Sequence, residues 1–407
     1  MAKRKFIKRL LKEPIVRILL TLVFCFFTYS VLPMWFFKGA LTLSILLKSL
    51  LLFFIPFLIF SGTATAFSSL KDNGLWFIIT IMGIIITSNF LNLMFSGFVG
   101  CYVIPHIAHL APHNPLEVHM DISPYFYCEL PHIFPNALAL FLGVVSGLLG
   151  AVFSLRSYMK AIYYIHKFTM GFMVKIFIPT LPIFLMGFVL KLLKEGQMSC
   201  FIQTNGSACS VMIGFLFIYL CLWWFFAHKC SKIPATTLLK NIFPAMITGA
   251  TTMSSAAALP FSIEAATKNT KDPVLVNAVM PISINFHMVG DTICIPILAV
   301  IILNSFSCPL PSFSMYLFFG FCFVLNKFAG AGIPGGTIMV SLPILHHYLG
   351  FTEEMLALIA ALYMLIDPIT TMGNVTANNF LVIFIKKAWG KITRKANKLF
   401  KEEIKSL

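Results

Sequence analysis

The stretch that decides the fold reads Ile247-Thr-Gly-Ala-Thr-Thr-Met-Ser-Ser-Ala-Ala-Ala-Leu-Pro260. A second stretch of the same kind reads Phe328-Ala-Gly-Ala-Gly-Ile-Pro-Gly-Gly-Thr-Ile-Met-Val-Ser-Leu-Pro343. Each is a turn of small residues between two apolar arms of helical length. Non-helical backbone is tolerated inside a bilayer only where protein buries it or where it lines a watery cavity. The two stretches therefore predict re-entrant hairpins whose tips meet at a site, with a pair of kinked ordinary helices as the alternative.

The rest of the chain is also apolar. Of its 407 residues, 59% are hydrophobic and 11% are charged, and the mean hydropathy is +0.90. A soluble domain usually has about 25% charged residues. Apolar runs long enough to cross a bilayer begin near eight positions: Ile15, Leu41, Leu75, Ile133, Ala161, Ile202, Val274 and Leu356. We expect an integral membrane protein whose first run is a retained helix and not a signal peptide, because a second run follows at once.

The net charge of +16 is concentrated at the two ends of the chain and in a few short loops. No Lys or Arg occurs between Lys71 and Arg156, so the loop over 105–132 carries none. By the positive-inside rule, both termini are expected to be cytoplasmic and this loop external. Lys191 and Lys194 do not fit the pattern and are expected to snorkel at the outer interface. Charge placed in this way favours a membrane topology over nucleic-acid binding, although a simple membrane anchor with basic ends would show it too.

The same charges set the expected direction of the two hairpins. Four basic residues flank the first hairpin: Lys232, Lys240, Lys268 and Lys271. Its entrance is therefore expected on the inside, and the second hairpin, one span later, is expected to enter from outside. Hairpins from opposite faces are typical of an inverted repeat that binds its substrate near the middle of the bilayer. The sequence contains no nucleotide-binding domain, so any transport is expected to be secondary.

Two acidic residues, Asp291 and Asp367, lie deep inside predicted spans. A carboxylate at such a depth is costly, so it is expected to be functional. In a helix, four more polar residues share the face of Asp367 by steps of three and four: Thr370, Thr371, Asn374 and Asn378. A polar stripe of this kind has to face protein or water. It predicts either a binding site or a hydrogen-bonded seam between helices.

Asp291 lies in the segment Asn285-Phe-His-Met-Val-Gly-Asp-Thr292, where Gly290 and the following Pro296 weaken the helix. His287 is four residues before Asp291, and the spacing allows the two to pair on one helix face. A broken helix frees backbone carbonyls that can bind a cation and N–H groups that can hold a carboxylate. We therefore expect an ion or substrate site at this break.

Nothing in the sequence indicates an enzyme or a cofactor, since it has no phosphate-binding glycine loop and no Gly-x-Ser-x-Gly elbow. The ten Cys residues form no Cys-x-x-Cys pair, and most are expected to act as small apolar residues. A disulfide is the alternative for those near the outer side: Cys101, Cys128, Cys200, Cys209 and Cys308. The His residues of 105–132 are expected to be polar loop residues, so no metal is expected beyond sodium.

Several motifs, in order along the chain, carry a resemblance to a known family. Met253-Ser-Ser-Ala-Ala-Ala-Leu-Pro260 is similar to an Arg-Ser-Ser-small-small-Leu-Pro hairpin tip, and Ala331-Gly-Ile-Pro-Gly-Gly336 to a second tip. His287-Met-Val-Gly-Asp-Thr292 stands in the place of Asn-Met-Asp-Gly-Thr. The run from Asp367 to Asn378 is similar to Asp-x-x-Arg-Thr-x-x-Asn-Val-x-x-Asp. Thr87-Ser88 sits where the family has a cation-binding Thr-Ser in its third span.

Residues from about Thr251 to Asn378 therefore resemble the dicarboxylate/amino acid:cation symporters, the glutamate/aspartate transporter family, whereas the first 230 or so match mainly in hydropathy. The resemblance implies an all-α integral membrane protein with eight transmembrane helices and two re-entrant helical hairpins. It also implies an inverted-repeat, elevator-type transporter that is usually a homotrimer in lipid. The implied scaffold covers 1–70 (spans one and two) and 133–200 (spans four and five). The implied transport domain covers 71–104 (span three) and 201–390. An external loop at 105–132 and a basic cytoplasmic tail at 391–407 complete the chain. Within 201–390 it implies span six, hairpin one at about 236–268, span seven at about 274–303, hairpin two at about 312–350 and span eight at about 353–386.

The resemblance also implies site residues. The external hairpin would serve as a gate, and the charge-assisted partner of the substrate's amino group would be Asp367. The implied substrate-binding residues are Ser254, Ser255, Gly332, Ile333, Pro334, Asp367, Thr370, Thr371 and Asn374. The implied cation-binding residues are Thr87, Ser88, Ser283, Asn285, His287, Asp291, Asn374 and Asn378.

The departures from the family pattern bear on the solute. Thr370 and Met253 stand where the family has Arg, so the side-chain carboxylate of glutamate would lack a bidentate partner. We therefore expect a neutral amino acid, small or hydroxylated, in preference to glutamate or aspartate.

The departures bear on the coupling ion as well. Val289 and Asn378 replace two carboxylates that bind sodium in the family. Lys327 could stand in for a cation, although a lysine that reaches water from its hairpin arm is the favoured interpretation. We expect sodium, with fewer ions than usual, ahead of a proton and ahead of uncoupled exchange.

Two other classes remain as alternatives. A channel or anion-conducting pore also uses re-entrant loops, and a receptor that binds a solute without moving it would fit the lost ligands. The short tails, with no targeting segment, favour a bacterial inner membrane.

Overall fold

The computed structural model describes residues 14–68, 75–107, 122–128, 130–131, 136–153, 156–330 and 335–406. In these ranges the chain is helical, with short connections and no strand. The first half comprises α2 (Pro14–Thr28), α3 (Met34–Ser68), α4 (Leu75–Phe98), the π-helical turn η2 (Val99–Val103), α5 (Ile104–Ile107), α6 (Asn136–Phe153), α7 (Arg156–Phe172), the π-helical turn η3 (Met173–Phe177) and α8 (Ile178–Lys194). The second half comprises α9 (Gln197–Ser231), α10 (Ala235–Thr252), α11 (Leu259–Thr270), α12 (Pro273–Phe286), α13 (Val289–Ser305), α14 (Phe313–Gly330), α15 (Gly336–Leu349) and α16 (Glu353–Ser406).

Five helices of the described ranges are long and apolar enough to cross a membrane: Met34–Thr65, Ile79–Ile107, Phe201–Ser231, Pro273–Ser305 and Glu353–Ala388. The pair Ser157–Phe177 and Pro179–Lys194, bent by 59°, makes a sixth candidate span. Three further apolar helices are shorter: Val16–Thr28, Phe141–Gly150 and Phe313–Lys327. The chain is thus a multi-pass membrane protein. The count of eight spans stays a prediction, because two of the expected spans are among the shorter helices.

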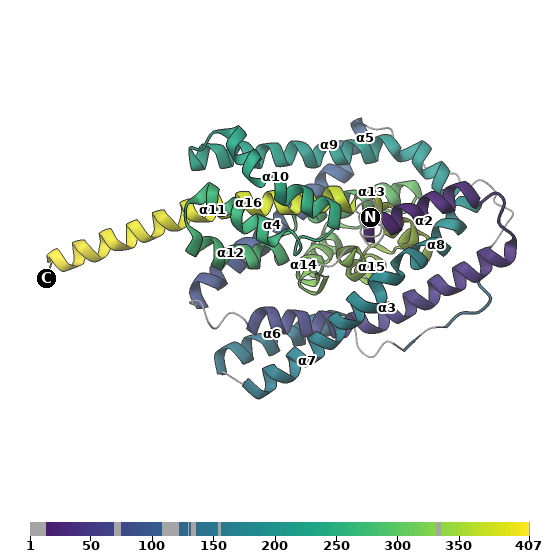
Figure 1. The fold of residues 1–407 in the computed structure, drawn as a ribbon, viewed down its shortest axis with the longest axis horizontal. Coiled ribbons are helices and arrows are strands. Elements are labelled where there is room, and N and C mark those ends of the chain that lie inside the picture. Colours follow the sequence, from purple (N-terminus) through teal and green to yellow (C-terminus); the bar gives the residue numbers. More distant parts are fainter. Residues whose placement is uncertain are drawn as a thin grey trace, which may run out of the picture.

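Most helices of the first half pack around α3, whereas α4 packs on α12, α13 and α14 of the second half. Helices α6, α7 and α8 all contact α3, and α2 packs on α8, so these elements form one side of the molecule (Figure 1). The stacked rings of Phe54 and Phe172, with centroids 3.8 Å apart, join α3 to α7. These helices lie within the ranges that the family resemblance implies for a scaffold, and that division stays a prediction.

Two helix pairs lie where the sequence predicts hairpins. The first is α10 and α11, which pack on each other and are joined through Met253, whose φ of 52° ends α10 in the left-handed region. Pro260 stands in the first turn of α11, where a missing N–H costs nothing. The second pair is α14 and α15, also packed together. Residues 331–334 of its turn lie outside the described ranges.

Helix α13 is the buried centre of the second half. Among its residues only Asn304 is not buried, and it contacts α4, α9 and α16. Between α12 and α13 the chain is extended at His287 (φ −96°, ψ 98°) and Met288 (φ −119°, ψ 70°). The predicted helix break is therefore present, at the two residues before Val289.

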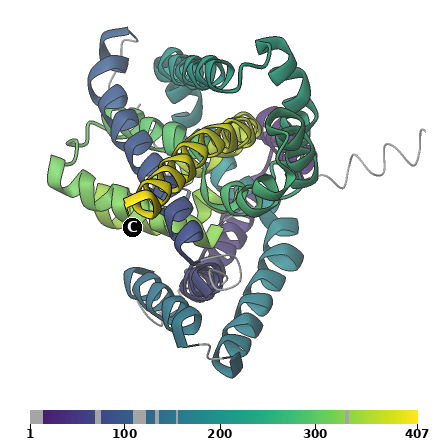
Figure 2. The same cartoon turned by 90° about the vertical axis from the view of Figure 1, so that its left-hand side faces the viewer.

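Helix α16 ties the second half together. It contacts α9 to α13 and α15, and a view along it shows the other helices around it (Figure 2). Its first residues also contact the first half, since Glu353 forms an ion pair with Lys48 of α3. Glu354 lies 3.7 Å from Lys191 of α8. Lys191, which was expected to snorkel at the outer interface, thus pairs with acidic groups that include Glu195 at 3.8 Å.

The cysteines whose side chains the structure describes are all free. They include four of the five residues that the sequence allowed as disulfide partners: Cys101, Cys128, Cys209 and Cys308. The fifth, Cys200, has a side chain outside the described set.

Candidate functional site

Asp367 is buried in the middle of α16, with 3% of its surface exposed. Its Oδ1 accepts a hydrogen bond of 2.8 Å from the Thr371 hydroxyl, one turn along the same helix. Its Oδ2 accepts a hydrogen bond of 2.9 Å from the backbone N–H of Gly335. Gly335 has a φ of 65° and precedes the first turn of α15, so a carboxylate there is favoured by the positive end of the helix dipole. Asp367 therefore joins the last helix to the second hairpin.

Asp291 lies in the first turn of α13 and is equally buried. The Tyr363 hydroxyl donates to its Oδ1 at 2.8 Å, and the Thr337 hydroxyl donates to its Oδ2 at 3.0 Å. The Lys327 ammonium stands 3.7 Å from the same Oδ2. Asp291 thus collects groups from α14, α15 and α16, all aimed at the break between α12 and α13.

Tyr363 connects the two carboxylates. Besides its bond to Asp291, its hydroxyl lies 3.4 Å from Oδ1 of Asp367, and the Thr370 hydroxyl lies 3.5 Å from it. The side chains of Tyr363, Asp291 and Asp367 are all buried. Asp291 and Asp367 therefore belong to one polar cluster, joined through the Tyr363 hydroxyl.

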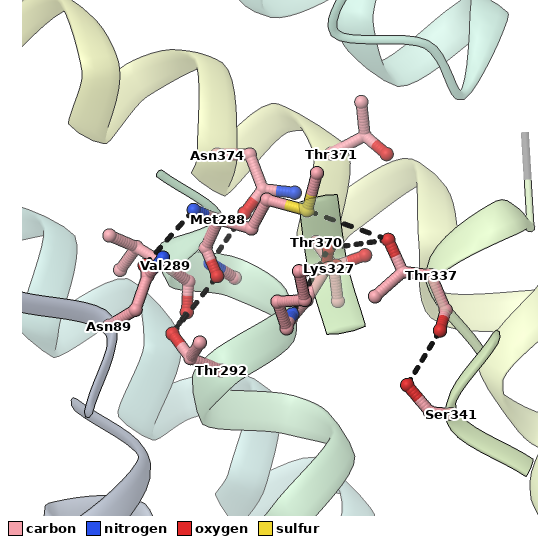
Figure 3. A network of polar contacts seen from close by, with 12 residues as sticks. Asn89, Met288, Val289, Thr292, Lys327, Thr337, Ser341, Thr370, Thr371 and Asn374 are labelled. Carbon is pink, nitrogen blue, oxygen red and sulfur yellow. Dashed lines mark hydrogen bonds and ion pairs between the residues drawn. The ribbon is translucent and has the colours of Figure 1, made fainter. Parts of the chain in front are cut away.

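A cavity of about 20 Å³ lies between these groups. Its walls come from both hairpins, the helix break and the last helix: Met253, Ser255, Met288, Asp291, Gly335, Thr337, Tyr363, Asp367, Thr371 and Asn374. Figure 3 shows several of these side chains converging from different helices, with Thr337 against the Met288 sulfur at 3.6 Å. A space of this size holds about one water molecule. The space between the described residues is too small for a solute larger than water.

The helix break is held against α16 by close backbone contact. The Asn374 Oδ1 atom accepts a hydrogen bond of 2.8 Å from the Gly290 N–H. A Cβ at Gly290 would lie 2.2 Å from the carbonyl oxygen of Thr370. Glycine is thus the residue that allows α13 to approach α16 this closely, which brings Asp291 into reach of Tyr363.

A second buried cluster surrounds His287 on the other side of the break. Its Nε2 lies 3.0 Å from the Ser88 hydroxyl and its Nδ1 lies 3.0 Å from Oδ1 of Asn378. The Trp223 ring lies 5.4 Å from the imidazole, centroid to centroid. Asn89 holds the backbone on both sides of His287. Its amide NH2 donates to the Phe286 carbonyl, and its amide oxygen accepts from the Met288 N–H at 3.2 Å. This cluster joins α4, the helix break and α16.

The expected substrate-binding residues fall into three groups. Four of them line the cavity: Ser255, Asp367, Thr371 and Asn374. Thr370 does not line it, but its hydroxyl contacts the hydroxyl of Tyr363, which does. Ser254 is on the first hairpin turn, where its hydroxyl accepts from the Ala257 N–H at 3.3 Å. Gly332, Ile333 and Pro334 lie outside the described residues.

The expected cation-binding residues are more dispersed. Asp291 and Asn374 are at the cavity, and Ser88, His287 and Asn378 form the second cluster. The remaining three have other surroundings: Thr87 is exposed on α4, Ser283 donates to the Met280 carbonyl and Asn285 donates to the Pro281 carbonyl. The two clusters therefore hold five of the eight expected cation ligands, two at the cavity and three around His287.

Two interpretations drawn from the sequence are wrong. His287 and Asp291 do not pair, because the extended residues between α12 and α13 break the four-residue helical phase that the pairing needs. Lys327 does not reach water: it is 1% exposed, since α14 packs on α4 and α15 and turns the ammonium toward Asp291.

Several residues of the site were missed in the sequence: Asn89, Gly335, Thr337 and Tyr363. Tyr363 had a signal, because it stands four residues before Asp367 and thus on the face of the polar stripe. Thr337 follows the second small-residue turn by one residue, which gives no sign of its partner. Its contact with Asp291 depends on tertiary packing.

The described residues thus form an apolar helical bundle with the helices of a multi-pass membrane protein, and two buried carboxylates lie where α13, α15 and α16 meet. The model of the sodium:dicarboxylate symporter family matches residues 14–388, nearly the whole chain. The chain belongs to that family, as its motifs led us to expect. A search of curated proteins found no match.

Proposed function

We propose that the protein is a secondary active transporter that moves a small neutral amino acid across a membrane together with a cation. The observation that supports it most is the position of Asp367. This carboxylate is buried among residues from both hairpins, the helix break and the last helix. A site made by so many independent elements changes shape when any one of them moves, which is what alternating access requires.

The solute's amino group is assigned to Asp367. An ammonium in the cavity would form a charge-assisted hydrogen bond with this carboxylate, in competition with the Gly335 N–H that now donates to Oδ2. Loss of that bond would release α15 from α16. The second hairpin is therefore the part proposed to open and close over the solute.

The carboxylate end of the solute is assigned to neutral donors. Ser255 and Thr371 present hydroxyls and Asn374 an amide at the cavity wall. The ten lining residues include two carboxylates and no Lys or Arg. The nearest ammonium, Lys327, is already held by Asp291, so a second carboxylate on the solute would find no free basic partner among the described residues, and a neutral amino acid is preferred over glutamate or aspartate.

The architecture of the proposal follows from the family and the packing. Eight spans and two oppositely inserted hairpins would divide into a scaffold (α2, α3 and α6 to α8) and a mobile transport unit (α4 and α9 to α16). The unit would move like an elevator within a homotrimer, in a bacterial inner membrane with both termini cytoplasmic. The ion pairs of Lys48 and Lys191 with the start of α16 would be contacts between the two parts.

Counterflow into proteoliposomes tests the function. Vesicles loaded with unlabelled L-serine should accumulate labelled L-serine from outside, and labelled L-aspartate should compete poorly. Asp367→Asn should abolish the accumulation. Asp272→Asn is the matched control, because Asp272 caps α12 through the Leu275 N–H and Asn caps equally well.

Two other results would replace the proposal. Voltage-driven current without exchange would indicate a channel. Binding of L-serine without accumulation in any gradient would indicate a receptor.

A further inference from the structure

Lys327 occupies an unusual position for a lysine in a membrane helix. Its side chain is 1% exposed, and its ammonium lies over the Phe323 ring at 4.6 Å from the centroid. Its charged partner is Asp291, 3.7 Å away. Among the described residues the Nζ atom has no hydrogen-bond acceptor, so it is held by charge and by the ring face.

The charges of the cluster do not balance. With all three groups ionised, Asp291 and Asp367 would contribute two negative charges and Lys327 one positive charge, a sum of −1; the structure places the ammonium beside Asp291. Tyr363, Thr337 and Thr371 add neutral hydroxyl donors. A buried ammonium is held where an opposite charge compensates it, and Asp291 is the partner that the geometry assigns to it. Asp367 is the carboxylate left without a cation.

We propose that the Lys327 ammonium is a built-in cation that neutralises Asp291, so that sodium is not a ligand of Asp291. A free cation bound to this carboxylate would stand a few ångströms from the ammonium, with little water to screen their repulsion. Both carboxylate oxygens already accept hydrogen bonds from hydroxyls. At this position the sodium expected from the sequence is replaced by a side chain.

The consequence for the solute rests on the function proposed above. With Asp291 neutralised from within, the cluster takes up one further positive charge, at Asp367. A solute with a single protonated amine supplies it. A zwitterionic amino acid brings a negative carboxylate together with its ammonium, so the cluster and the solute together still carry one negative charge. One coupling cation per solute balances that charge.

Thermal unfolding of the purified full-length protein tests the built-in cation without any solute. The unfolding temperature is measured in sodium, methylammonium and choline chlorides at equal ionic strength. Lys327→Met keeps the length of the side chain and leaves Asp291 unpaired. We expect the Lys327→Met protein to unfold at a lower temperature than the wild type in choline. In sodium or methylammonium its unfolding temperature should rise by about 3 °C or more above its value in choline.

Two control variants sharpen the test. Lys327→Met combined with Asp291→Asn should lose this response, because no unpaired charge remains. If Lys327→Met alone does not fold, the double variant still should, and a double variant that also fails would contradict the pairing. Lys327→Arg keeps the charge and should show no greater cation response than the wild type.

The proposal is overturned if sodium raises the unfolding temperature of the wild type and Asp291→Asn removes that rise. It is also overturned if Lys327→Met responds to sodium no more than the wild type does. Counterflow of L-serine separates this proposal from the proposed function. A cation response without counterflow refutes the carrier alone, whereas counterflow with sodium bound at Asp291 refutes the built-in cation alone.

Discussion

The Gly335 N–H donates a hydrogen bond of 2.9 Å to the Asp367 carboxylate, and this bond fastens the second hairpin to the last helix. Gly335 is in the left-handed region, with a φ of 65°. A Cβ there would lie 2.2 Å from the Met364 methyl group. The hairpin thus reaches Asp367 because glycine permits both the backbone turn and the close approach to α16. We also assign this carboxylate to the solute's amino group. In the proposed function, solute binding would therefore compete with the hydrogen bond that holds α15 to α16.

Replacement of Tyr363 by Phe should weaken solute binding. The change removes the hydroxyl that donates to Asp291 and lies 3.4 Å from Asp367. A hydrogen bond to a charged group contributes about 1.5–3 kcal/mol, so the concentration of L-serine for half-maximal counterflow should rise at least about tenfold. Tyr163→Phe, at an exposed position of α7, is the control. An unchanged half-saturation in Tyr363→Phe would remove this hydroxyl from the site.

Gly290→Ala should destabilise the fold. Its Cβ would lie 2.2 Å from the Thr370 carbonyl oxygen, and overpacking of this kind costs about 1–3 kcal/mol. Gly83→Ala is the matched change, because nothing lies within 4 Å of the Cβ it would add, and alanine favours a helix. Thermal unfolding should separate the two variants by several degrees. Equal unfolding temperatures would show that α13 and α16 are not so closely packed.

His287→Leu should also lower the unfolding temperature. The leucine leaves the Ser88 hydroxyl and the Asn378 amide oxygen without their shared partner, and the buried Asn378 oxygen alone costs about 1–3 kcal/mol. The control is His106→Leu, because His106 is exposed and bonds the carbonyl of Tyr102 in its own helix. A His287→Leu protein as stable as the wild type would mean that the cluster contributes nothing to the packing of α4.

A cross-link between α8 and α16 should stop transport if the two parts of the molecule slide past each other. Lys191 and Glu354 approach to 3.7 Å, so Lys191→Cys with Glu354→Cys, joined by a flexible bis-maleimide, fixes the two helices together. Glu264→Cys with Lys268→Cys places the same linker within α11, where the native pair lies at 2.7 Å. Counterflow should fall to background in the first protein only. Full counterflow in a cross-linked Lys191–Glu354 protein would contradict an elevator motion.

Much of this organisation could be predicted from the sequence. The small-residue turn at 247–260 does lie between two packed helices, α10 and α11, and all five members of the stripe from Asp367 to Asn378 are buried. These features are local, because helical spacing and apolar composition fix them within a few turns. The helix break near Gly290 is local as well, although the extended residues are His287 and Met288.

The partners of the buried groups could not be predicted, because they depend on packing between distant segments. Lys327 and Asp291 are 36 positions apart, and nothing in the local sequence shows that α14 turns the ammonium inward. Ser88 and His287 are joined across 199 positions. The same holds for Thr337, whose hydroxyl finds Asp291 only because α15 packs beside α13.

The most direct test of the role of Asp367 is the affinity of the purified protein for L-serine, measured by calorimetry in the wild type and in Asp367→Asn. The substitution keeps the shape of the side chain and its contact with Thr371, but it removes the charge and turns an NH2 group, which cannot accept a hydrogen bond, toward the Gly335 N–H. We expect the affinity to fall about tenfold to a hundredfold, since a charge-assisted hydrogen bond contributes about 1.5–3 kcal/mol. Equal affinity in the two proteins would contradict the assignment of the solute's amino group to Asp367.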